Sequence, residues 1–189
     1  MLELYLIRHP KTVYNEERKI QGQLDVELIP GWEESVDSLT EKLALQGEFS
    51  AFLTSDLMRA NKVAYRVVER LIRKHGKPLV LRSTPDLRER HWGVLQGKSY
   101  DEVDTQGKDI HHYLLELDQV EGGESFAAIE ARVKRVDAYL RGIQGDRVCI
   151  IGHQFTNTYL SNFELEGNIL ARPYEDWPHL LIKQISFPI

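Results

Sequence analysis

Two apolar segments of the chain end in histidine, and arginines stand near them. LYLIRH ends in Arg8 and His9, VCIIGH ends in His153, and FSAFLT leads into SDLMRA with Arg59. Parallel strands bring such ends to one edge of a sheet, where α/β proteins place their chemistry. Guanidinium groups offer paired donors that match phosphate oxygens. We therefore interpret the four side chains as a preformed phosphoryl site, against the alternative of unrelated residues at a sheet edge.

The segments that must position these residues alternate between strand and helix. Apolar runs predict strands at residues 3–8, 49–54, 78–83, 146–153 and 180–187. Apolar residues three and four apart predict helices at 31–47, 56–75 and 124–143, with others near 107–119 and after 153. Ser55 and Gly76 would cap the helix at 56–75. This order predicts an α/β fold, a three-layer αβα sandwich with a mostly parallel central sheet, as a single domain over residues 1–189.

Composition limits the partners that the protein can have. The 189 residues carry a net charge of −5, so no global field attracts nucleic acid or an anionic membrane. An anionic ligand must be held by a local cluster of positive charge. The single cysteine, Cys149, lies in an apolar run, which is typical of a buried residue in a reducing compartment. No run reaches the ~18 apolar residues of a membrane span, and no signal peptide is recognisable, so we expect a cytoplasmic protein.

Several motifs occur in an order that is typical of one family. They are RHPKT with Asn15 six residues after His9, RKIQGQLD (18–25), TSDLMRA (54–60), LRERHWGVLQGK (87–98), GGES (122–125) and VCIIGH (148–153). Together they resemble the histidine phosphatase superfamily, the phosphoglycerate-mutase-like proteins, over roughly residues 4–157. The phosphatase branch fits best, because the stretch at 101–123 is shorter and more acidic than the insertion of the mutases.

The resemblance implies a role for each residue of the site. His9 would attack phosphorus and form a phosphohistidine, since a neutral imidazole nitrogen is available near pH 7. Arg8, Arg59 and His153 would stabilise the charge on the phosphoryl oxygens. Glu89 would protonate the leaving oxygen and later take a proton from water. Its neighbours Arg88 and Arg90 would oppose the protonated carboxyl, so we expect them to be turned outward or engaged elsewhere.

Four further residues are candidates for substrate binding, namely Asn15, Thr12, Gln21 and Gly22. Asn15 could donate a hydrogen bond to the phosphoryl group. The hydroxyl of Thr12 could join the pocket or cap a turn. Arg18, Gln21 and Gly22 could shape the loop over the site or only help that loop to fold, and the second is favoured. Trp92 could line the pocket or belong to the core, and we favour the core.

Two residues depart from the family pattern, which has glycine at both positions. Pro10 follows His9 and removes a backbone donor. Gln154 follows His153, and it would be strained if that position required a positive φ. These departures support the alternative of a binding module without turnover.

Three functions therefore remain open: a metal-independent phosphomonoesterase acting on a small phosphorylated metabolite, a phosphoglycerate mutase-type phosphotransferase, and a degenerate phospho-ligand binding module. The resemblance implies no metal or other cofactor. His112 and Glu116 have helical spacing that invites a metal interpretation with His111, but a solvated helix face is favoured. An edge strand could pair two copies into a homodimer, and the sequence does not identify the substrate.

Overall fold

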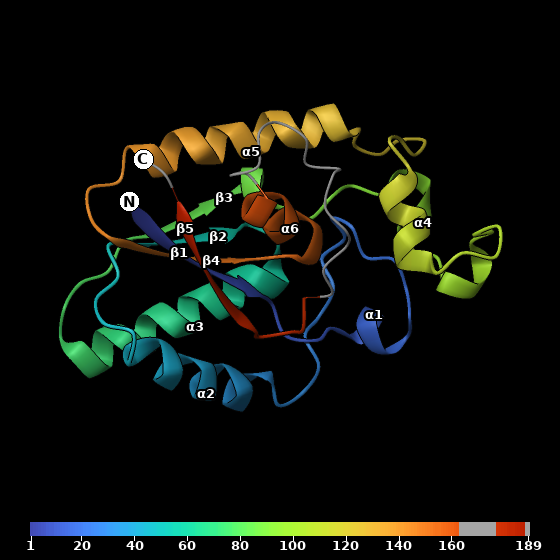
Figure 1. Ribbon diagram of the computed structural model, residues 1–189. Helices are drawn as coiled ribbons and strands as arrows, with labels where there is room; N and C mark the ends of the chain where they lie inside the picture. Colours follow the sequence, from blue (N-terminus) through green and yellow to red (C-terminus); the bar gives the residue numbers. More distant parts are fainter. Residues whose placement is uncertain (163–176, 188–189) are drawn as a thin grey trace.

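A five-stranded sheet forms the centre of the computed structural model, which describes residues 1–162 and 177–187. Its strands are β1 (Leu2–Arg8), β2 (Ala51–Ser55), β3 (Leu81–Thr84), β4 (Arg147–Gly152) and β5 (Ile182–Phe187). They lie in the order β3-β2-β4-β1-β5. All neighbouring pairs are parallel except β1 and β5, which are antiparallel. The fold class is therefore the predicted one, a mostly parallel sheet between helices (Figure 1).

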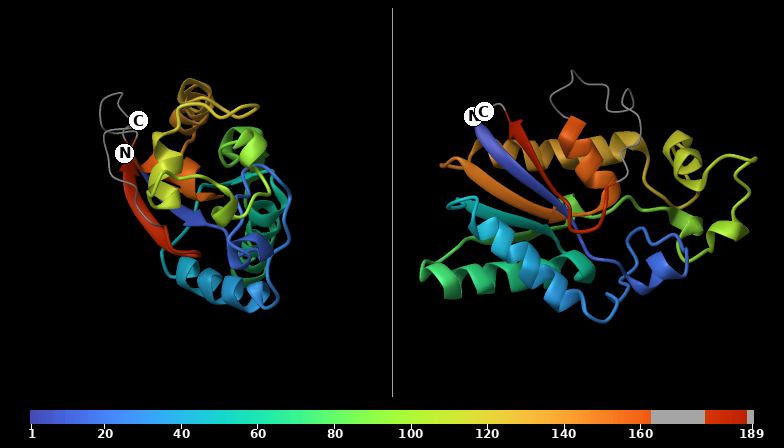
Figure 2. Two further views of the ribbon diagram at one scale, coloured as in Figure 1. Left: turned by 90° about the vertical axis from the view of Figure 1, so that its right-hand side faces the viewer. Right: turned by 60° about the horizontal axis from the view of Figure 1, so that its bottom comes forward.

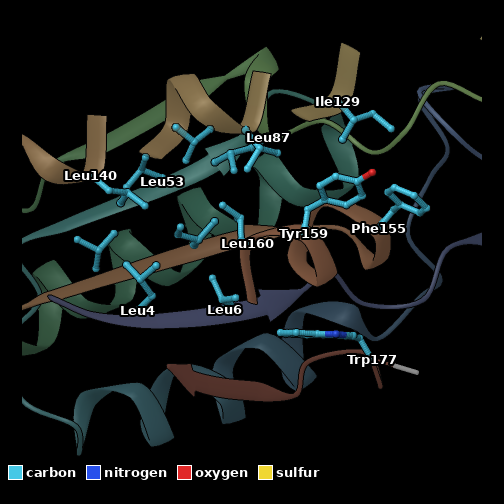
Figure 3. Close-up of a cluster of buried hydrophobic side chains, with 14 of the residues drawn as sticks. Leu4, Leu6, Leu53, Leu87, Ile129, Leu140, Phe155, Tyr159, Leu160 and Trp177 are labelled. Carbon is cyan, nitrogen blue, oxygen red and sulfur yellow. The ribbon is translucent and has the colours of Figure 1, made fainter. Parts of the chain in front are cut away.

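The strands β1, β2 and β4 are buried on both faces, and their alternate residues enter different clusters. Leu4 and Leu6 of β1 belong to one hydrophobic cluster, and Tyr5 and Ile7 belong to another. Strands covered on both faces are apolar almost throughout, which explains why these segments are unbroken apolar runs in the sequence. Figure 3 shows part of the first cluster, which fills the space between the sheet and helices α5 (Phe126–Arg141) and α6 (Gln154–Asn162).

Helices α2 (Trp32–Ala44) and α3 (Met58–His75) cover the opposite face (Figure 1). Gly76 ends α3 in the left-handed region at φ 67°, as predicted. The predicted cap at the other end is wrong. Leu57 precedes the helix, and Ser55 is still the last residue of β2, although its hydroxyl accepts a hydrogen bond from the Leu57 backbone N–H.

The short elements lie beyond the carboxyl ends of the parallel strands. They are α1 (Val13–Glu16), α4 (Ile110–Glu116) and the 3-10 turns η1 (Pro85–Leu87), η2 (Gly93–Leu95) and η3 (Tyr100–Glu102). Figure 2 shows α1 and α4 together at that end of the molecule. The loop at 18–20 joins the segment 97–100 through paired backbone hydrogen bonds, among them Ile20 N–H to Lys98 O at 2.9 Å. These elements enclose one end of the sheet.

Two further structural observations concern the single cysteine and the apolar character of the helices. Cys149 is fully buried and unpaired, and its burial raises the pKa of its thiol. No helix among the described residues is both long and apolar enough to cross a lipid bilayer.

Candidate active site

A cleft opens at the carboxyl ends of the parallel strands. Arg8 is the last residue of β1, His9 follows it, and Arg59 is the second residue of α3, directly after β2. The strand register aligns Arg8 with Gly152 of β4, and the His9 N–H donates to the Gly152 carbonyl at 3.1 Å. The cleft is lined by Arg8, His9, Asn15, Lys19, Ile20, Gln21, Gly22, Arg59, Glu89, Trp92, Tyr100, His111, Leu114, Gln154 and Phe155.

Hydrogen bonds at both ring nitrogens define the tautomer of His9. Its Nδ1 lies 2.6 Å from the carbonyl oxygen of Pro10, which can only accept, so Nδ1 carries the proton. Its Nε2 accepts a hydrogen bond from Arg59 Nε at 3.2 Å. Burial, then the charges of Arg59 and Arg8, hold the pKa of His9 well below its ordinary value of 6.5. His9 is thus a neutral imidazole near pH 7 with its lone pair on Nε2, which is the form that a nucleophile requires.

Arg59 is only 1% exposed, and two backbone carbonyls fix its guanidinium. Its terminal nitrogens donate to Leu24 O at 2.8 Å and to Gly22 O at 2.6 Å. Burial lowers the pKa of Arg59 to about 10, which leaves the group charged at neutral pH. Gly22 has a φ of +53°, and a Cβ there would come within 2.0 Å of Gln96 Oε1, so the loop that holds Arg59 requires glycine at this position.

Glu89 reaches the cleft from the loop that follows η1 and is 9% exposed. Its Oε1 accepts from the Arg90 N–H at 2.8 Å, and its Oε2 accepts from the Phe155 N–H at 3.2 Å. Phe155 stands in the first turn of α6, where backbone N–H groups have no partner within the helix. Two backbone donors therefore fix this carboxylate.

Both arginines beside Glu89 are engaged elsewhere, as expected. Arg88 makes a two-point ion pair with Asp56 at 2.6 and 2.7 Å. Arg90 is fully buried rather than turned outward, and its guanidinium lies against the rings of Trp92 and Phe126 at 4.3 and 4.5 Å. It also donates to the carbonyl oxygens of Leu117, Asp118 and Glu124. In these contacts, neither guanidinium donates a hydrogen bond to the Glu89 carboxylate.

His153 lies beside His9 but does not line the cleft. Their ring centroids are 5.2 Å apart, and His153 is fully buried. Neither of its ring nitrogens has a hydrogen-bond partner among the described residues. Burial, then the charge of Arg59, holds its pKa well below 6.5. Of the four side chains predicted to converge, Arg8, His9 and Arg59 share the cleft, and His153 is packed next to the His9 ring.

The two departures from the family pattern have structural roles here. Gln154 starts α6 without a positive φ, so the strain considered for it does not arise. Its Oε1 accepts from Arg8 at 2.8 Å and from the Trp177 N–H at 3.2 Å. Pro10 supplies the carbonyl that fixes the His9 tautomer. Arg8 also donates to the carbonyl oxygen of Trp177 at 2.7 Å, which holds it at the cleft wall.

Three of the four predicted binding residues, Asn15, Gln21 and Gly22, line the cleft. Thr12 does not line it, which corrects that expectation. It is fully buried, and its hydroxyl caps α1 by accepting from the Asn15 N–H while lying 2.9 Å from Gln21 Oε1. Thr12 thus supports the residues of the cleft and is kept from direct contact with it.

Sequence reasoning missed several residues that the fold brings to the site. His111 lines the cleft, so the solvated helix face holds for His112 and Glu116 but is wrong for His111. Lys19 and Tyr100 also line it. Trp92 belongs to the core cluster, as favoured, and it also lines the cleft. Among the described residues, no group of three histidines, cysteines or acidic residues could hold a metal ion.

His179 was also missed, and it contacts the backbone of His9. Its Nδ1 lies 2.6 Å from the His9 carbonyl oxygen, and the two rings are 5.5 Å apart. The next residue, Leu180, donates its N–H to the Arg8 carbonyl at 3.0 Å. No periodicity or motif could have indicated a contact between residues 170 positions apart.

Comparison with known proteins agrees with this geometry. The family model of the histidine phosphatase superfamily (branch 1) matches residues 4–180. A phosphoglycerate mutase-like protein of Arabidopsis thaliana is 33% identical over 159 residues, which are 80% of this chain and 66% of that protein. A metal-independent phosphoserine phosphatase of the same plant is 28% identical over 80% of this chain and 63% of its own length. The chain thus spans slightly less than two thirds of these two relatives.

Among solved structures, a mycobacterial glucosyl-3-phosphoglycerate phosphatase in complex with VO3 has a TM-score of 0.81 and 26% identity. The alignment covers 98% of this chain and 93% of that one. The chain therefore belongs to the histidine phosphatase superfamily, branch 1. Its curated relatives include proteins named for phosphatase and for mutase activity.

Proposed function

We propose that the protein is a metal-independent phosphomonoesterase that acts on a small phosphorylated metabolite through a phosphohistidine at His9. The observation that carries the proposal is the state of His9, which is buried, neutral and hydrogen-bonded through Nδ1, so that Nε2 holds the lone pair beside Arg59. Phosphatases among the relatives support the same reaction class.

In the first step, the phosphoryl group enters between His9 Nε2 and the Arg59 N–H that now donates to it. Nε2 gives its electron pair to phosphorus, and the P–O bond to the alcohol breaks as the N–P bond forms. The leaving oxygen keeps that electron pair and receives a proton from Glu89, whose carboxyl must be protonated when the substrate is bound. Arg8 and Arg59 stabilise the charge on the equatorial phosphoryl oxygens, because the loose transition state spreads charge over them.

In the second step, water attacks phosphorus in line with the N–P bond. The Glu89 carboxylate takes a proton from this water, the N–P bond breaks, and its electron pair returns to Nε2. Inorganic phosphate leaves, and His9 and Glu89 recover their starting states. The buried His153, whose pKa is held well below 6.5, packs beside the His9 ring.

A phosphoglycerate mutase activity is the second candidate, because relatives carry that name, including a probable phosphoglycerate mutase of Serratia proteamaculans with 28% identity. A mutase would form the same phosphohistidine but would return the group to phosphoglycerate. The two activities differ in whether inorganic phosphate is released.

The test incubates the protein with 32P-labelled phosphate esters and quenches the reaction in alkali, where phosphohistidine survives. We expect an acid-labile label and release of inorganic phosphate, and His9→Ala should abolish both. His112→Ala is the matched control, because His112 is exposed on α4 and does not line the cleft. Labelling without phosphate release would support the mutase, and phosphate release from His9→Ala would overturn the proposal.

A further inference from the structure

Four apolar side chains contribute to the wall of the cleft. This hydrophobic wall consists of Ile20, Trp92, Leu114 and Phe155, all members of one buried cluster that also line the cleft. The rings of Trp92 and Phe155 meet edge to face at 5.7 Å. The backbone N–H of Phe155 donates to Glu89, so the wall begins next to the carboxylate that would face the leaving oxygen.

A second set of residues forms a polar rim at the same cleft. This polar rim consists of Lys19, Tyr100 and His111, which are half-buried, whereas the wall is buried. The Lys19 ammonium already pairs with Glu17 at 2.7 Å. Tyr100 and His111 pack edge to face at 5.6 Å. Burial raises the pKa of Tyr100, so its hydroxyl stays neutral near pH 7. The rim therefore keeps hydrogen-bonding groups at the cleft, as Asn15, Gln21 and Gln154 also do, but its lysine already pairs with Glu17.

The hydrophobic wall is fixed from behind. The Arg90 guanidinium stacks on Trp92 at 4.3 Å and lies 5.4 Å from the Phe155 ring, away from the cleft. Its hydrogen bonds to Leu117 O and Asp118 O tie the end of α4 to the same support. A wall held by such contacts keeps its shape when a ligand enters, which lowers the cost of binding.

We propose that the alcohol portion of the substrate is a compact hydrocarbon group, aliphatic or aromatic, rather than a sugar or a glycerate. This inference rests on the proposed phosphatase activity. Arg8 and Arg59 serve the phosphoryl group, and the ester oxygen at Glu89 directs the rest of the alcohol along the wall. Hydroxyl or carboxylate groups that lie against this wall would lose water without gaining partners from it, whereas apolar surface gains by burial.

The test compares esters of primary alcohols, so that the leaving groups have similar reactivity. The series is 2-phenylethyl phosphate, n-hexyl phosphate, glycerol 3-phosphate and 3-phosphoglycerate. We expect kcat/KM to be at least about tenfold higher for the two hydrocarbon esters, because even single methylene groups in an apolar pocket change kcat/KM by that order. A preference for glycerol 3-phosphate or 3-phosphoglycerate would overturn the inference.

A matched pair of variants locates the preference. Leu114→Asn should reduce the ratio between 2-phenylethyl phosphate and glycerol 3-phosphate by about tenfold. Val94→Asn makes a comparable change at a half-exposed residue that does not line the cleft, and it should leave the ratio unchanged. An unchanged ratio in folded Leu114→Asn protein, checked by circular dichroism, would contradict the role of the wall.

Binding of unreactive phosphonates separates this inference from the phosphatase proposal. Calorimetric affinity should rise along the series methyl-, propyl- and hexylphosphonate, whether or not any ester is hydrolysed. Failure of every ester to release phosphate, with this rise intact, would overturn the proposed activity and keep the apolar subsite. Equal affinities along the series would overturn the subsite itself.

Discussion

At the scale of single residues, one acceptor and one donor leave the His9 ring one choice of tautomer. The Pro10 carbonyl accepts a hydrogen bond from Nδ1–H, and the Arg59 Nε–H donates to Nε2. His179 holds the His9 carbonyl from the other side of the backbone. The backbone and ring of His9 are thus both restrained before a substrate binds, and such positioning is a large part of catalysis in phosphoryl transfer.

Replacement of His179 tests this restraint. We expect His179→Ala to lower kcat roughly tenfold with little change in KM, because the His9 backbone would lose a hydrogen bond while the cleft walls remain. His179→Asn, which can still donate, should recover part of kcat. A rise in KM at constant kcat would show that His179 contacts substrate and does not act through His9.

Sequence reasoning at this scale succeeded where strand ends determine position. Arg8, His9 and Arg59 follow directly from apolar runs, because the carboxyl ends of parallel strands share an edge. It failed for Tyr100 and His111, which reach the cleft through turns at 96–110 with no periodicity. It also could not show that His153 is packed beside His9 and does not line the cleft, since that depends on side-chain packing.

At the scale of elements, the segment from η2 to the start of α5 is held by close backbone approach. Gly93 has a φ of +51°, and a Cβ there would come within 1.9 Å of the Glu121 carbonyl oxygen. Glu124 forms a mostly buried ion pair with Arg132 at 2.9 Å and accepts from the His91 N–H. These contacts join residues 91–93, which lead from Glu89 to the hydrophobic wall at Trp92, to residues 121–124.

Substitution of two glycines separates crowding from backbone strain. Gly107 has a φ of +79°, and a Cβ at this position would have no atom of the described residues within 4 Å. Gly107→Ala should therefore cost only about 1–2 kcal/mol of unfolding free energy, from backbone strain alone. Gly93→Ala adds a backbone clash and should cost roughly twice as much or more. Urea unfolding measures both, and equal losses would show that the segment at 121–123 moves aside freely.

The elements themselves were well predicted, with differences at their ends. The helix predicted at 107–119 covers Ile110–Glu116, and it begins at Ile110 because Asp109 caps it there. The strand predicted at 78–83 occupies Leu81–Thr84 instead. Apolar runs indicate which segments enter the core, but hydrogen bonds to neighbouring segments decide where each element begins and ends.

At the scale of the whole molecule, two buried neutral histidines couple stability to pH. The folded state holds the pKa of His9 and of His153 well below 6.5, and the unfolded state restores ordinary values. Between the lowered pKa values of the folded state and the ordinary value of 6.5, the unfolded chain binds protons that the folded chain does not. The contribution of the two neutral histidines to the free energy of unfolding is therefore complete above pH 6.5 and is lost as the pH falls below it.

The free energy of unfolding should consequently fall below pH 6.5 by up to about 1.4 kcal/mol per pH unit for each histidine. His153→Asn should remove one histidine's share of that slope in urea unfolding between pH 7.5 and 5.0. His75→Asn is the matched control at an exposed histidine and should leave the slope intact. An unchanged slope in His153→Asn would contradict the burial of a neutral His153.

The assignment of His9 Nε2 as the nucleophile is tested by the position of the phosphoryl group on the trapped phosphoenzyme. Nuclear magnetic resonance of 15N-histidine protein, phosphorylated and held in alkali, measures which ring nitrogen couples to 31P. We predict a single phosphohistidine at His9 with phosphorus on Nε2. Phosphorus on Nδ1, or on any other residue, would rule out His9 Nε2 as the nucleophile.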